Sequence, residues 1–454
     1  MVRMALKNFR IVDSHSDFFG SLIIEDRIIK KVIPHSPSDA PELIDGDFRT
    51  ASIIINGADF QAQCTEDSYP VLMPAFIDLH AHFRDTGTLG TGTPSPAETL
   101  ESASLAAAAG GFGTVVCMAN TQPVTDTTEK ARLMKQRCDA LGLIDLYPVV
   151  SLTKNMDGRE LTSIPDNAPY RPLLLSEDGK DIADEAVFLS AMKQAAHLRI
   201  PVSCHCDFGG DEAERAKAAN APRAEWSRIE ENNAVKRAIE LGKRAGCHVH
   251  IAHVSTQEAA GLIRAEKKAM RLTSPGSGFI LSCEATPHHI AANEDDARRM
   301  GENSHGRVNP PLRSEADRLA IIEALRDGTI DAIATDHAPH GNADKAAGSP
   351  GFVGLETAFS VCLSALENCG LQKLSGLMSA APARILGLDA ARGRIAPGML
   401  ADVVIADLHT QWTVETTEFY SRGSCTPFAG KSLQGKILLT IHNGKIVYEV
   451  TRND

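Results

Sequence analysis

The chain has 454 residues, of which 43% are apolar and 23% charged, a balance that excludes a disordered, fibrous or coiled-coil protein. Lys and Arg number 46 against 58 Asp and Glu, so the net charge is −12, and only 5% of the residues are aromatic. Nucleic acids bind basic faces and stack on aromatic side chains, so we expect no nucleic-acid partner.

No stretch of the sequence is typical of a targeting or membrane segment. The first eight residues are not followed by the apolar core of a secretory signal. The mildly apolar stretch 102–119 is broken by Gly110, Gly111 and Gly113, which predicts a helix, a turn and a strand rather than a membrane span. Ten cysteines are scattered without a Cys-x-x-Cys motif, as in proteins with reduced thiols. We therefore expect a cytoplasmic protein with no membrane partner.

Both ends of the chain carry short runs with the composition of β-strands. They lie at 9–13, 20–24, 28–33 and 53–55 near the start, and at 401–407, 437–441 and 445–448 near the end. Asn443-Gly444, between the last two runs, is a favoured hairpin turn. Neither end is long enough to bury a core alone. We expect residues 1–70 and 390–454 to pair into one composite, sandwich-like β domain.

Residues 71–389 alternate between β-rich runs and helical stretches. The β-rich runs lie near 71–79, 114–119, 146–151, 172–176, 201–206, 248–254, 280–285 and 331–335. Helical stretches such as 96–109, 128–141, 182–198, 256–270 and 315–326 fall between most of them. Eight strands with intervening helices predict a (β/α)8 barrel. The predicted fold class is therefore α/β, a TIM-like barrel with a small β domain.

Histidine and carboxylate side chains gather at the ends of the predicted barrel strands. They are His80 and His82 on the first run, Asp178 after the fourth, His205 on the fifth, His253 on the sixth and Asp336 on the eighth. The carboxyl ends of barrel strands meet at one mouth, so these groups should lie together. Imidazole and carboxylate are the non-thiolate ligands of zinc. The set predicts a site for one or two Zn²⁺ ions.

Strand alternation also suggests where neighbouring side chains point. Arg84 lies two residues past His82 and should face the same mouth, where its guanidinium can hold a carboxylate; a salt bridge at the rim is the alternative. His248 and His250 precede His253 on one run, and His250 is out of phase with His253. We therefore expect His250 to face away from the site.

The run Pro74-Ala-Phe-Ile-Asp-Leu-His-Ala-His-Phe-Arg84 resembles the metal-binding opening of the amidohydrolase superfamily. Later motifs resemble, in the same order, those of the bacterial type I dihydroorotases. They are Gly110-Gly-Phe-Gly-Thr-Val-Val-Cys-Met-Ala-Asn-Thr-Gln-Pro, Ser176-Glu-Asp-Gly, His253-Val-Ser-Thr, Thr286-Pro-His-His, Arg307-Val-Asn-Pro-Pro-Leu-Arg and Asp336-His-Ala-Pro-His. The resemblance runs from about residue 70 to the C-terminus, and residues 1–70 match only in being β-rich.

The resemblance implies a role for each candidate ligand. His80, His82 and Asp336 would hold the first zinc ion, His205 and His253 the second, and Asp178 would bridge them. Many relatives use a carbamylated lysine on the fourth strand instead, but residues 170–175 contain none, and Lys180 lies further along the loop. Glu177 is the neighbouring alternative to Asp178.

The implied reaction is the reversible closure of N-carbamoyl-L-aspartate to L-dihydroorotate, a step of de novo pyrimidine biosynthesis. In hydrolysis, Asp336 would take the proton of the attacking hydroxide and pass it to the leaving ring nitrogen. Arg84, Asn120 and His340 would hold the substrate carboxylate, and Asn309 would contact the ring. We also expect a homo-oligomer, a dimer, and an association with aspartate transcarbamoylase.

Two loops depart from the family pattern. Arg84-Asp-Thr-Gly replaces Arg-Glu-Pro-Gly, and Met118-Ala-Asn-Thr replaces Met-Pro-Asn-Thr, which puts the fit of the substrate carboxylate in doubt.

Three other functions are alternatives to dihydroorotase. Dihydropyrimidinase (hydantoinase) and allantoinase share the fold and the metals, but the former should carry the bridging lysine and lack the His82-Phe-Arg84 pattern. A non-catalytic dihydroorotase-like subunit should have lost zinc ligands, whereas this sequence keeps all six.

Overall fold

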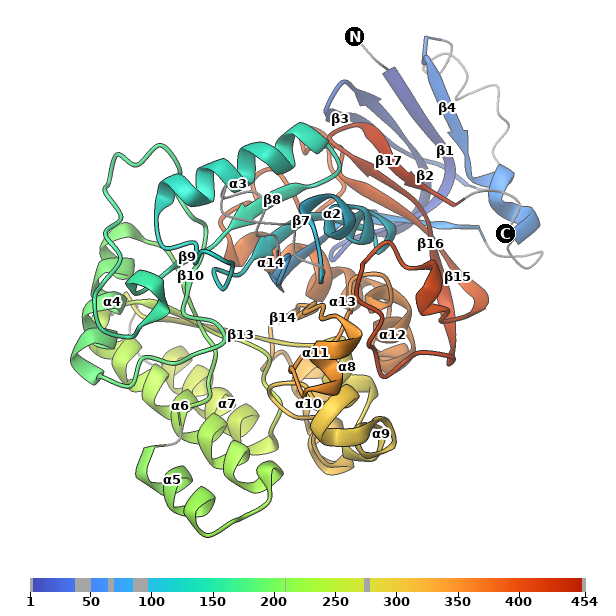
Figure 1. The fold of residues 1–454 in the computed structure, drawn as a ribbon. Helices are drawn as coiled ribbons and strands as arrows, with labels where there is room; N and C mark the ends of the chain where they lie inside the picture. Colours follow the sequence, from blue (N-terminus) through green and yellow to red (C-terminus); the bar gives the residue numbers. More distant parts are fainter. Residues whose placement is uncertain are drawn as a thin grey trace.

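The computed structural model describes residues 3–36, 50–63, 69–84, 97–208, 210–272 and 278–450. These residues form a (β/α)8 barrel beside an eight-stranded sheet built from both ends of the chain (Figure 1). The predicted fold class is therefore confirmed. The departure at Asp85-Thr86 lies outside the described residues.

The barrel strands pair in parallel and in chain order. They are β6 (Phe76–Ala81), β7 (Phe112–Cys117), β8 (Asp145–Pro148) with β9 (Val150–Ser151), β10 (Leu175–Ser176), β11 (Val202–Cys204), β12 (His248–Ile251), β13 (Ile280–Ala285) and β14 (Ala332–Ile333). Hydrogen bonds connect β6, β7 and β8 in one sheet and β9 through β14 in another. A parallel bridge between Ala81 and His337 joins the last strand to the first and closes the ring.

Helices surround the strands and cover their apolar faces. They are α2 (Leu100–Ala109), α3 (Thr128–Leu141), α4 (Glu185–Leu198), α5 (Gly210–Ala218), α6 (Arg223–Ala245), α7 (Gln257–Leu272), α8 (Pro287–Ala291), α9 (Glu294–Met300), α10 (Glu315–Arg326), α11 (Asn342–Ala346), α12 (Ala358–Ala365), α13 (Leu371–Ser375) and α14 (Ala381–Ile385). Thr127 and Ser314 cap α3 and α10 with their side-chain oxygens. These caps explain why both helices span the residues that the sequence predicts.

The two ends of the chain share one sheet. Its strands are β1 (Arg3–Val12), β2 (Asp17–Glu25), β3 (Ile28–Pro34), β4 (Ile53–Asn56), β5 (Val71–Pro74), β15 (Val403–Thr413), β16 (Ser432–His442) and β17 (Lys445–Glu449). The order is β17-β16-β15-β5-β1-β2-β3, with β4 on β1, so the blue and red ends of Figure 1 lie side by side. Asn443 and Gly444 both have positive φ, 50° and 73°, as the predicted hairpin turn between β16 and β17 requires.

The sheet and the barrel join at Ala75. The predicted run 71–79 is two strands, because β5 pairs with β15 of the terminal sheet while β6 pairs with β7 of the barrel. Between them, the backbone N–H of Ala75 donates to the carbonyl of Asp402, 2.9 Å away. The boundaries predicted for the two domains, 1–70 with 390–454 and 71–389, stay predictions.

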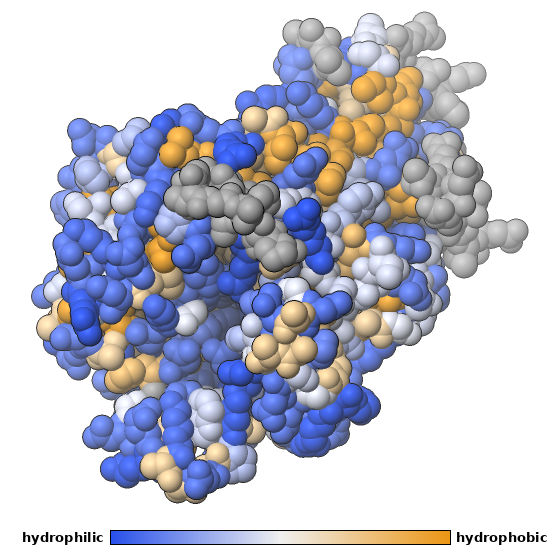
Figure 2. Space-filling view, in the orientation of Figure 1, coloured by the Kyte–Doolittle hydropathy of each residue, from blue (hydrophilic) through white to orange (hydrophobic). Residues whose placement is uncertain are grey.

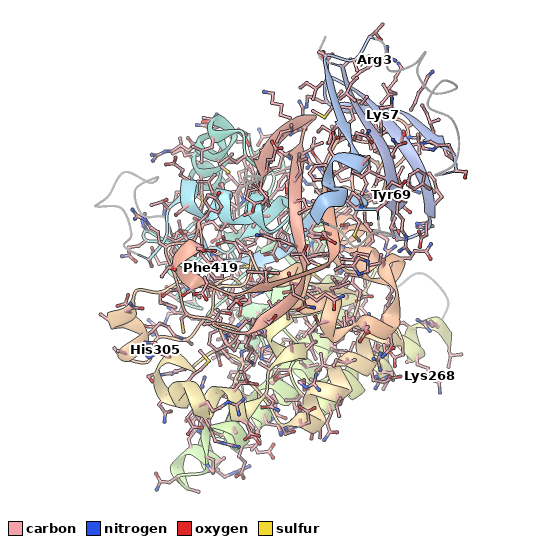
Figure 3. The ribbon with its side chains drawn as sticks, turned by 90° about the vertical axis from the view of Figure 1, so that its right-hand side faces the viewer. Arg3, Lys7, Tyr69, Lys268, His305 and Phe419 are labelled. Carbon is pink, nitrogen blue, oxygen red and sulfur yellow. The ribbon has the colours of Figure 1, made fainter. Side chains whose placement is uncertain are left out.

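The surface differs between the sheet and the barrel. Hydrophobic side chains gather over the terminal sheet at the upper right of Figure 2, and Ile54 on β4 is 53% exposed. In Figure 3, Arg3, Lys7 and Tyr69 lie with this sheet, whereas Lys268 lies on helix α7 outside the barrel strands, away from them. No helix among the described residues combines the length and the apolar character needed to cross a membrane. The nine cysteines described are free thiols.

Candidate metal centre

The structure brings all six predicted ligands together at the carboxyl ends of the barrel strands. His80 lies on β6 and His82 just beyond it, while Asp178, His205, His253 and Asp336 follow β10, β11, β12 and β14. All six side chains are buried, with at most 7% of any residue exposed. Parallel strands present their carboxyl ends at one edge, so residues far apart in the sequence meet here.

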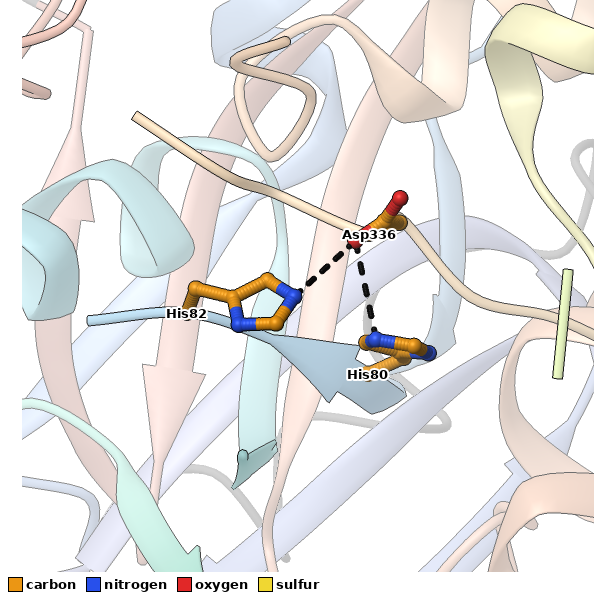
Figure 4. Close-up of side chains that lie close together, drawn as sticks. All are labelled: His80, His82 and Asp336. Carbon is orange, nitrogen blue, oxygen red and sulfur yellow. Dashed lines mark hydrogen bonds and ion pairs between the residues drawn. The ribbon is translucent and has the colours of Figure 1, made fainter. Parts of the chain in front are cut away.

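One group consists of His80, His82 and Asp336 (Figure 4). Asp336 Oδ1 lies 3.1 Å from His82 Nε2 and 3.5 Å from His80 Nε2. The three candidate ligand atoms lie within 4.8 Å of one another. This spacing suits a cation with bonds of about 2 Å to each ligand.

Asp178 lies between this group and two further histidines. Its Oδ1 is 3.1 Å from His80 Nε2 and 3.2 Å from His205 Nδ1, and its Oδ2 is 3.4 Å from His82 Nε2. His253 Nε2 lies 4.0 Å from Asp178 Oδ1 and 2.6 Å from His205 Nδ1. Each oxygen of Asp178 therefore faces histidines, which is the arrangement a bridging carboxylate needs.

Glu177 points elsewhere. Its carboxylate accepts a hydrogen bond from the backbone N–H of Thr153 at 3.0 Å and another from the Thr153 hydroxyl. Burial raises the pKa of Glu177, although these hydrogen bonds oppose the shift. Of the two neighbouring carboxylates, the geometry favours Asp178 as the one that faces the cluster.

The buried titratable groups of the cluster shift one another's pKa values. Burial favours neutral histidine, but Asp178 and Asp336 raise the pKa of His80 well above its usual value. Burial favours a neutral Asp178, but His80, His205 and His82 hold its pKa well below the usual value. Burial, with His205 and His80, lowers the pKa of His253 to about 3. Two ionised carboxylates thus depend on buried positive charge, which a metal cation can supply in place of histidine protons.

Two atoms of the cluster have no hydrogen-bond partner. They are His80 Nε2 and Asp178 Oδ1, both fully buried. Burying a polar atom without a partner costs about 1–3 kcal/mol. A divalent cation between them would satisfy both atoms, and the nitrogen and oxygen donors are those that zinc accepts. The residues present therefore fit a metal ion.

Backbone conformation turns several of these side chains into the mouth. His253, Asp336 and Arg84 have positive φ angles of 30°, 47° and 51°. A residue with a Cβ pays about 1–3 kcal/mol for such a conformation, and such residues cluster at functional sites. β12 ends at Ile251, so strand alternation does not extend to His253.

The expectation that His250 faces away from the site is wrong for this reason. Its Nε2 lies 3.0 Å from Glu284 Oε2, and Glu284 Oε1 lies 3.0 Å from His80 Nδ1. His250 therefore lies behind His80 inside the barrel. The left-handed turn at His253 breaks the alternation on which the expectation depended.

The predicted carboxylate-binding residues lie next to the cluster. Arg84 Nη2 is 3.5 Å from His340 Nε2, and Arg84 Nε is buried without a hydrogen bond. Among the described residues, Arg84 makes no ion pair closer than 4.0 Å. Asn120 Oδ1 accepts a hydrogen bond from His82 Nδ1 at 2.8 Å, so His82 Nε2 carries the lone pair that faces the cluster.

Asn309 lies on the opposite side, next to His205. Its Nδ2 is 3.1 Å from His205 Nε2, and its Oδ1 accepts a hydrogen bond of 3.3 Å from Arg223 Nη2. Arg223 begins α6, and its Nε is buried without a partner. Burial, together with Arg307 and Arg313, lowers the pKa of Arg223 to about 10. Arg223 is not among the residues predicted from the sequence, because nothing in its local sequence marks it as facing the mouth.

Comparison with known proteins identifies the family. The amidohydrolase family model matches residues 71–447. A dihydroorotase of Clostridium botulinum is 37% identical over 454 residues, 99% of this chain and 100% of that protein. A dihydroorotase of Staphylococcus epidermidis is 34% identical over 443 residues, 94% and 99% of the two chains. The chain belongs to the dihydroorotase family of the amidohydrolases.

Solved structures of other amidohydrolases share the fold of this dihydroorotase-family chain. An L-hydantoinase (dihydropyrimidinase) from Arthrobacter aurescens matches with a TM-score of 0.80 and 24% identity, covering 99% of this chain and 96% of the other. A dihydropyrimidinase from Brevibacillus agri matches with a TM-score of 0.78 and 18% identity, covering 99% and 95%. At these identities the likeness concerns the fold alone.

Family membership and the buried cluster together establish a metal-dependent hydrolase of cyclic amides with a small-molecule substrate. This member of the dihydroorotase family has no lysine on β10 or the residues just before it. Lys180 donates to the carbonyl of Met156 at 3.0 Å instead of facing the cluster. His337, next to Asp336, lies 3.4 Å from Glu98 through its Nε2.

Proposed function

We propose that the protein is a dihydroorotase that interconverts N-carbamoyl-L-aspartate and L-dihydroorotate. The observation that carries this proposal is Arg84, whose guanidinium lies beside the metal cluster without a carboxylate partner among the described residues. A carboxylate on the substrate would complete that interaction in a bidentate way. The full-length relatives described as dihydroorotases support the same substrate.

The proposed metal centre would hold one or two Zn²⁺ ions. His80, His82 and Asp336 would bind the first ion, His205 and His253 the second, and Asp178 would bridge them. When bound, zinc supplies a water with a pKa of about 7 and polarises the amide carbonyl. The protein's own contribution is to bury and orient the six ligands.

Asp336 is the proposed proton carrier. Burial alone would favour its neutral form, but His80, His82 and His253 hold its pKa well below the usual value. It is therefore ionised at neutral pH and able to accept a proton from the attacking group. Delivering this proton to the ring nitrogen makes that nitrogen a neutral leaving group.

The other proposed contacts orient the substrate. Arg84, His340 and Asn120 would hold the carboxylate that does not react, and Asn309 would contact the ring. Burial, followed by the charge of Arg84, lowers the pKa of His340 to about 4, so its ring is neutral at physiological pH. Arg84 then provides the positive charge. The neutral His340 ring donates its Nε2–H to the carbonyl of Pro350 at 2.8 Å, so His340 would help by packing beside Arg84.

Turnover of three cyclic amides tests this function. The zinc-loaded protein is assayed with L-dihydroorotate, hydantoin and allantoin under identical conditions. We expect selective hydrolysis of L-dihydroorotate, because the other two lack the carboxylate that Arg84 would bind. Activity on hydantoin or allantoin alone would keep the metal centre but refute the carboxylate site. Zinc-bound protein inactive on all three would favour the non-catalytic subunit.

Assembly and location stay predictions. We propose a homodimer, an association with aspartate transcarbamoylase and a cytoplasmic location. Light scattering of the purified protein tests the dimer, and co-elution with aspartate transcarbamoylase from the same source tests the association. Fractionation of the source cells tests the location.

A further inference from the structure

A chain of buried polar groups extends from His80 through two neighbouring strands of the barrel. Glu284 on β13 lies 3.0 Å from His80 Nδ1 through Oε1 and 3.0 Å from His250 Nε2 through Oε2. Ser282 Oγ lies 2.9 Å from His250 Nδ1 and 2.8 Å from His248 Nε2. We call these four residues, His248, His250, Ser282 and Glu284, the polar chain.

Strand pairing places the polar chain in one row. β12 and β13 are parallel neighbours in which His250 pairs with Ser282. Residues 248 and 250 share one face of β12, and residues 282 and 284 share one face of β13. Glu284, His250 and Ser282 are at most 5% exposed. The other end, His248, is only partly buried and lines a cavity with Gly246 and Arg384.

The hydrogen-bond donors of the chain follow from its geometry. Each oxygen of Glu284 faces one imidazole nitrogen at 3.0 Å, His80 Nδ1 for Oε1 and His250 Nε2 for Oε2. Carboxylate oxygens accept, so His80 Nδ1–H and His250 Nε2–H are the donors. Ser282 then donates its hydroxyl proton to His250 Nδ1 and accepts from His248 Nε2–H. The Ser282 hydroxyl thus forms a hydrogen bond with each of the two histidines.

We propose that Glu284, supported by His250 and Ser282, is a positioning residue that holds His80 in the tautomer required for metal binding. With Nδ1 protonated, His80 Nε2 keeps its lone pair, and this is the atom that faces Asp178 and Asp336 without a hydrogen-bond partner. An ionised acceptor also makes the imidazole a stronger ligand. This inference rests on the metal centre proposed above.

His80 on β6 and His82 just beyond it are therefore oriented by different acceptors. His82 donates to the neutral amide oxygen of Asn120, whereas His80 donates to the carboxylate of Glu284. His80 also lies in both candidate ligand groups. Loss of its orientation should therefore weaken metal binding more than the loss of an ordinary buried hydrogen bond would.

Zinc affinity of two variants tests the proposal. Glu284→Gln offers one acceptor oxygen instead of two, so either His80 or His250 loses its acceptor. Ser282→Ala removes the hydroxyl that orients His250 but leaves Glu284 in place, and its small volume change favours folding. The zinc dissociation constant is measured by competition with a chelator, and the ligand geometry is followed by the absorption spectrum of the Co²⁺-substituted protein.

We expect Glu284→Gln to weaken zinc binding by about 10- to 100-fold, with a changed Co²⁺ spectrum. Ser282→Ala should weaken it in the same direction but less. Asp402→Asn is the matched control, because Asp402 is a buried carboxylate in an ion pair with Arg392, away from the cluster. It should lower the melting temperature without changing the zinc dissociation constant.

Three results would contradict the proposal in distinguishable ways. Wild-type zinc affinity and Co²⁺ spectrum in both variants would overturn the positioning role and leave the metal centre intact. Equal loss of zinc affinity in Glu284→Gln and Asp402→Asn would show that the polar chain affects zinc binding only through the stability of the fold. Failure of the wild-type protein to bind zinc would overturn the metal centre itself, and the proposed function with it.

Discussion

Asp336 combines the position of a metal ligand with an unfavourable backbone conformation. Its Oδ1 lies within 3.5 Å of both His80 and His82, where a metal ligand is needed, and its backbone has a φ of 47°. That conformation costs free energy in any residue with a Cβ. Packing of the barrel therefore holds Asp336 in a conformation it would not adopt alone, and its orientation is fixed before substrate arrives.

Replacement of Asp336 should stop catalysis. Asp336→Ala removes a ligand and the proton carrier, and we expect kcat to fall by at least about 10³-fold. Asp336→Asn keeps one oxygen ligand but cannot accept a proton, so it should retain more zinc and still be inactive. Steady-state kinetics with zinc analysis distinguish the two losses. Near-normal turnover by either variant would contradict the role of Asp336.

Replacement of Arg84 should act on substrate binding. Arg84→Ala removes a charge-assisted, bidentate interaction, so kcat/KM should fall by about 10- to 100-fold, mainly through KM. The fall must be equal in both directions, because a substitution cannot change the reaction equilibrium. Arg84→Lys keeps the charge without the planar guanidinium and should be intermediate. Unchanged KM and kcat/KM in Arg84→Ala would mean that the carboxylate is bound elsewhere.

At the level of elements, one buried ion pair ties α6 to two loops at the mouth. Arg313 Nη2 lies 3.0 Å from Glu231 Oε2, and both residues are at most 5% exposed. Arg313 also donates to Ser255 Oγ at 2.9 Å, and Glu231 accepts from the backbone N–H of Ser255 at 2.8 Å. Ser255 lies two residues after His253, so this network supports the loop that carries a candidate ligand.

Breaking this pair should destabilise the protein strongly. Arg313→Met and Glu231→Gln each leave a buried polar group without its partner, and we expect each to lower the free energy of unfolding by about 3–5 kcal/mol. The double variant should lose less than the sum, because neither partner is then left unpaired. Urea unfolding of the four proteins measures the cycle. Strict additivity would show that the two side chains do not interact.

Elements could be predicted where local signals mark them. α3 and α10 match the predicted bounds because Thr127 and Ser314 supply N-caps. The β-rich runs locate the barrel strands because each is short, apolar and followed by helical sequence. The division at Ala75 and the direction of His250 could not be predicted, since the first depends on pairing with β15 and the second on the turn at His253.

Across the whole molecule, Arg392 links the barrel to the terminal sheet. Its Nη1 donates to Asp402 Oδ2 at 2.6 Å, just before β15, and to Thr114 Oγ1 on β7 at 2.8 Å. It also contacts Asp145 on β8. Both Arg392 and Asp402 are buried. The hydrogen bond to Thr114 joins two parts of the chain that are 278 residues apart.

The stability provided by Arg392 should depend on pH. Burial would raise the pKa of Asp402, but His442 and Arg392 hold it below its usual value. A carboxyl group with a lowered folded-state pKa stabilises the protein above its unfolded value, about 3.9, and this stabilisation is lost as pH falls through the folded value. Arg392→Met should therefore cost about 3–5 kcal/mol at pH 7 and less as pH falls below about 4.

Urea unfolding at several pH values measures this dependence. Arg326→Met is the control. The Arg326 side chain is 40% exposed, and its ion pair with Glu323 is long, with 4.0 Å between Nη1 and Oε2. It should change stability by less than about 0.5 kcal/mol at every pH. A pH-independent penalty for Arg392→Met would contradict the ion pair with Asp402.

The site could be predicted in part because barrel topology converts sequence order into position. The carboxyl ends of the barrel strands meet at the same mouth, which brings the six candidate ligands together. Glu284 escaped prediction because it lies inside a buried strand and its partner, His80, is 204 residues away. A carboxylate in a buried, mostly apolar strand was the available signal, since such a group needs a buried partner.

Turnover of L-dihydroorotate during zinc titration tests the central claim most directly. Metal-free protein is prepared with a chelator, zinc is added in steps, and hydrolysis and zinc per chain are measured together. The account predicts no activity without metal and a rise that reaches a plateau at one or two zinc ions per chain. Full activity of the metal-free protein, or zinc binding without hydrolysis of L-dihydroorotate, would contradict it.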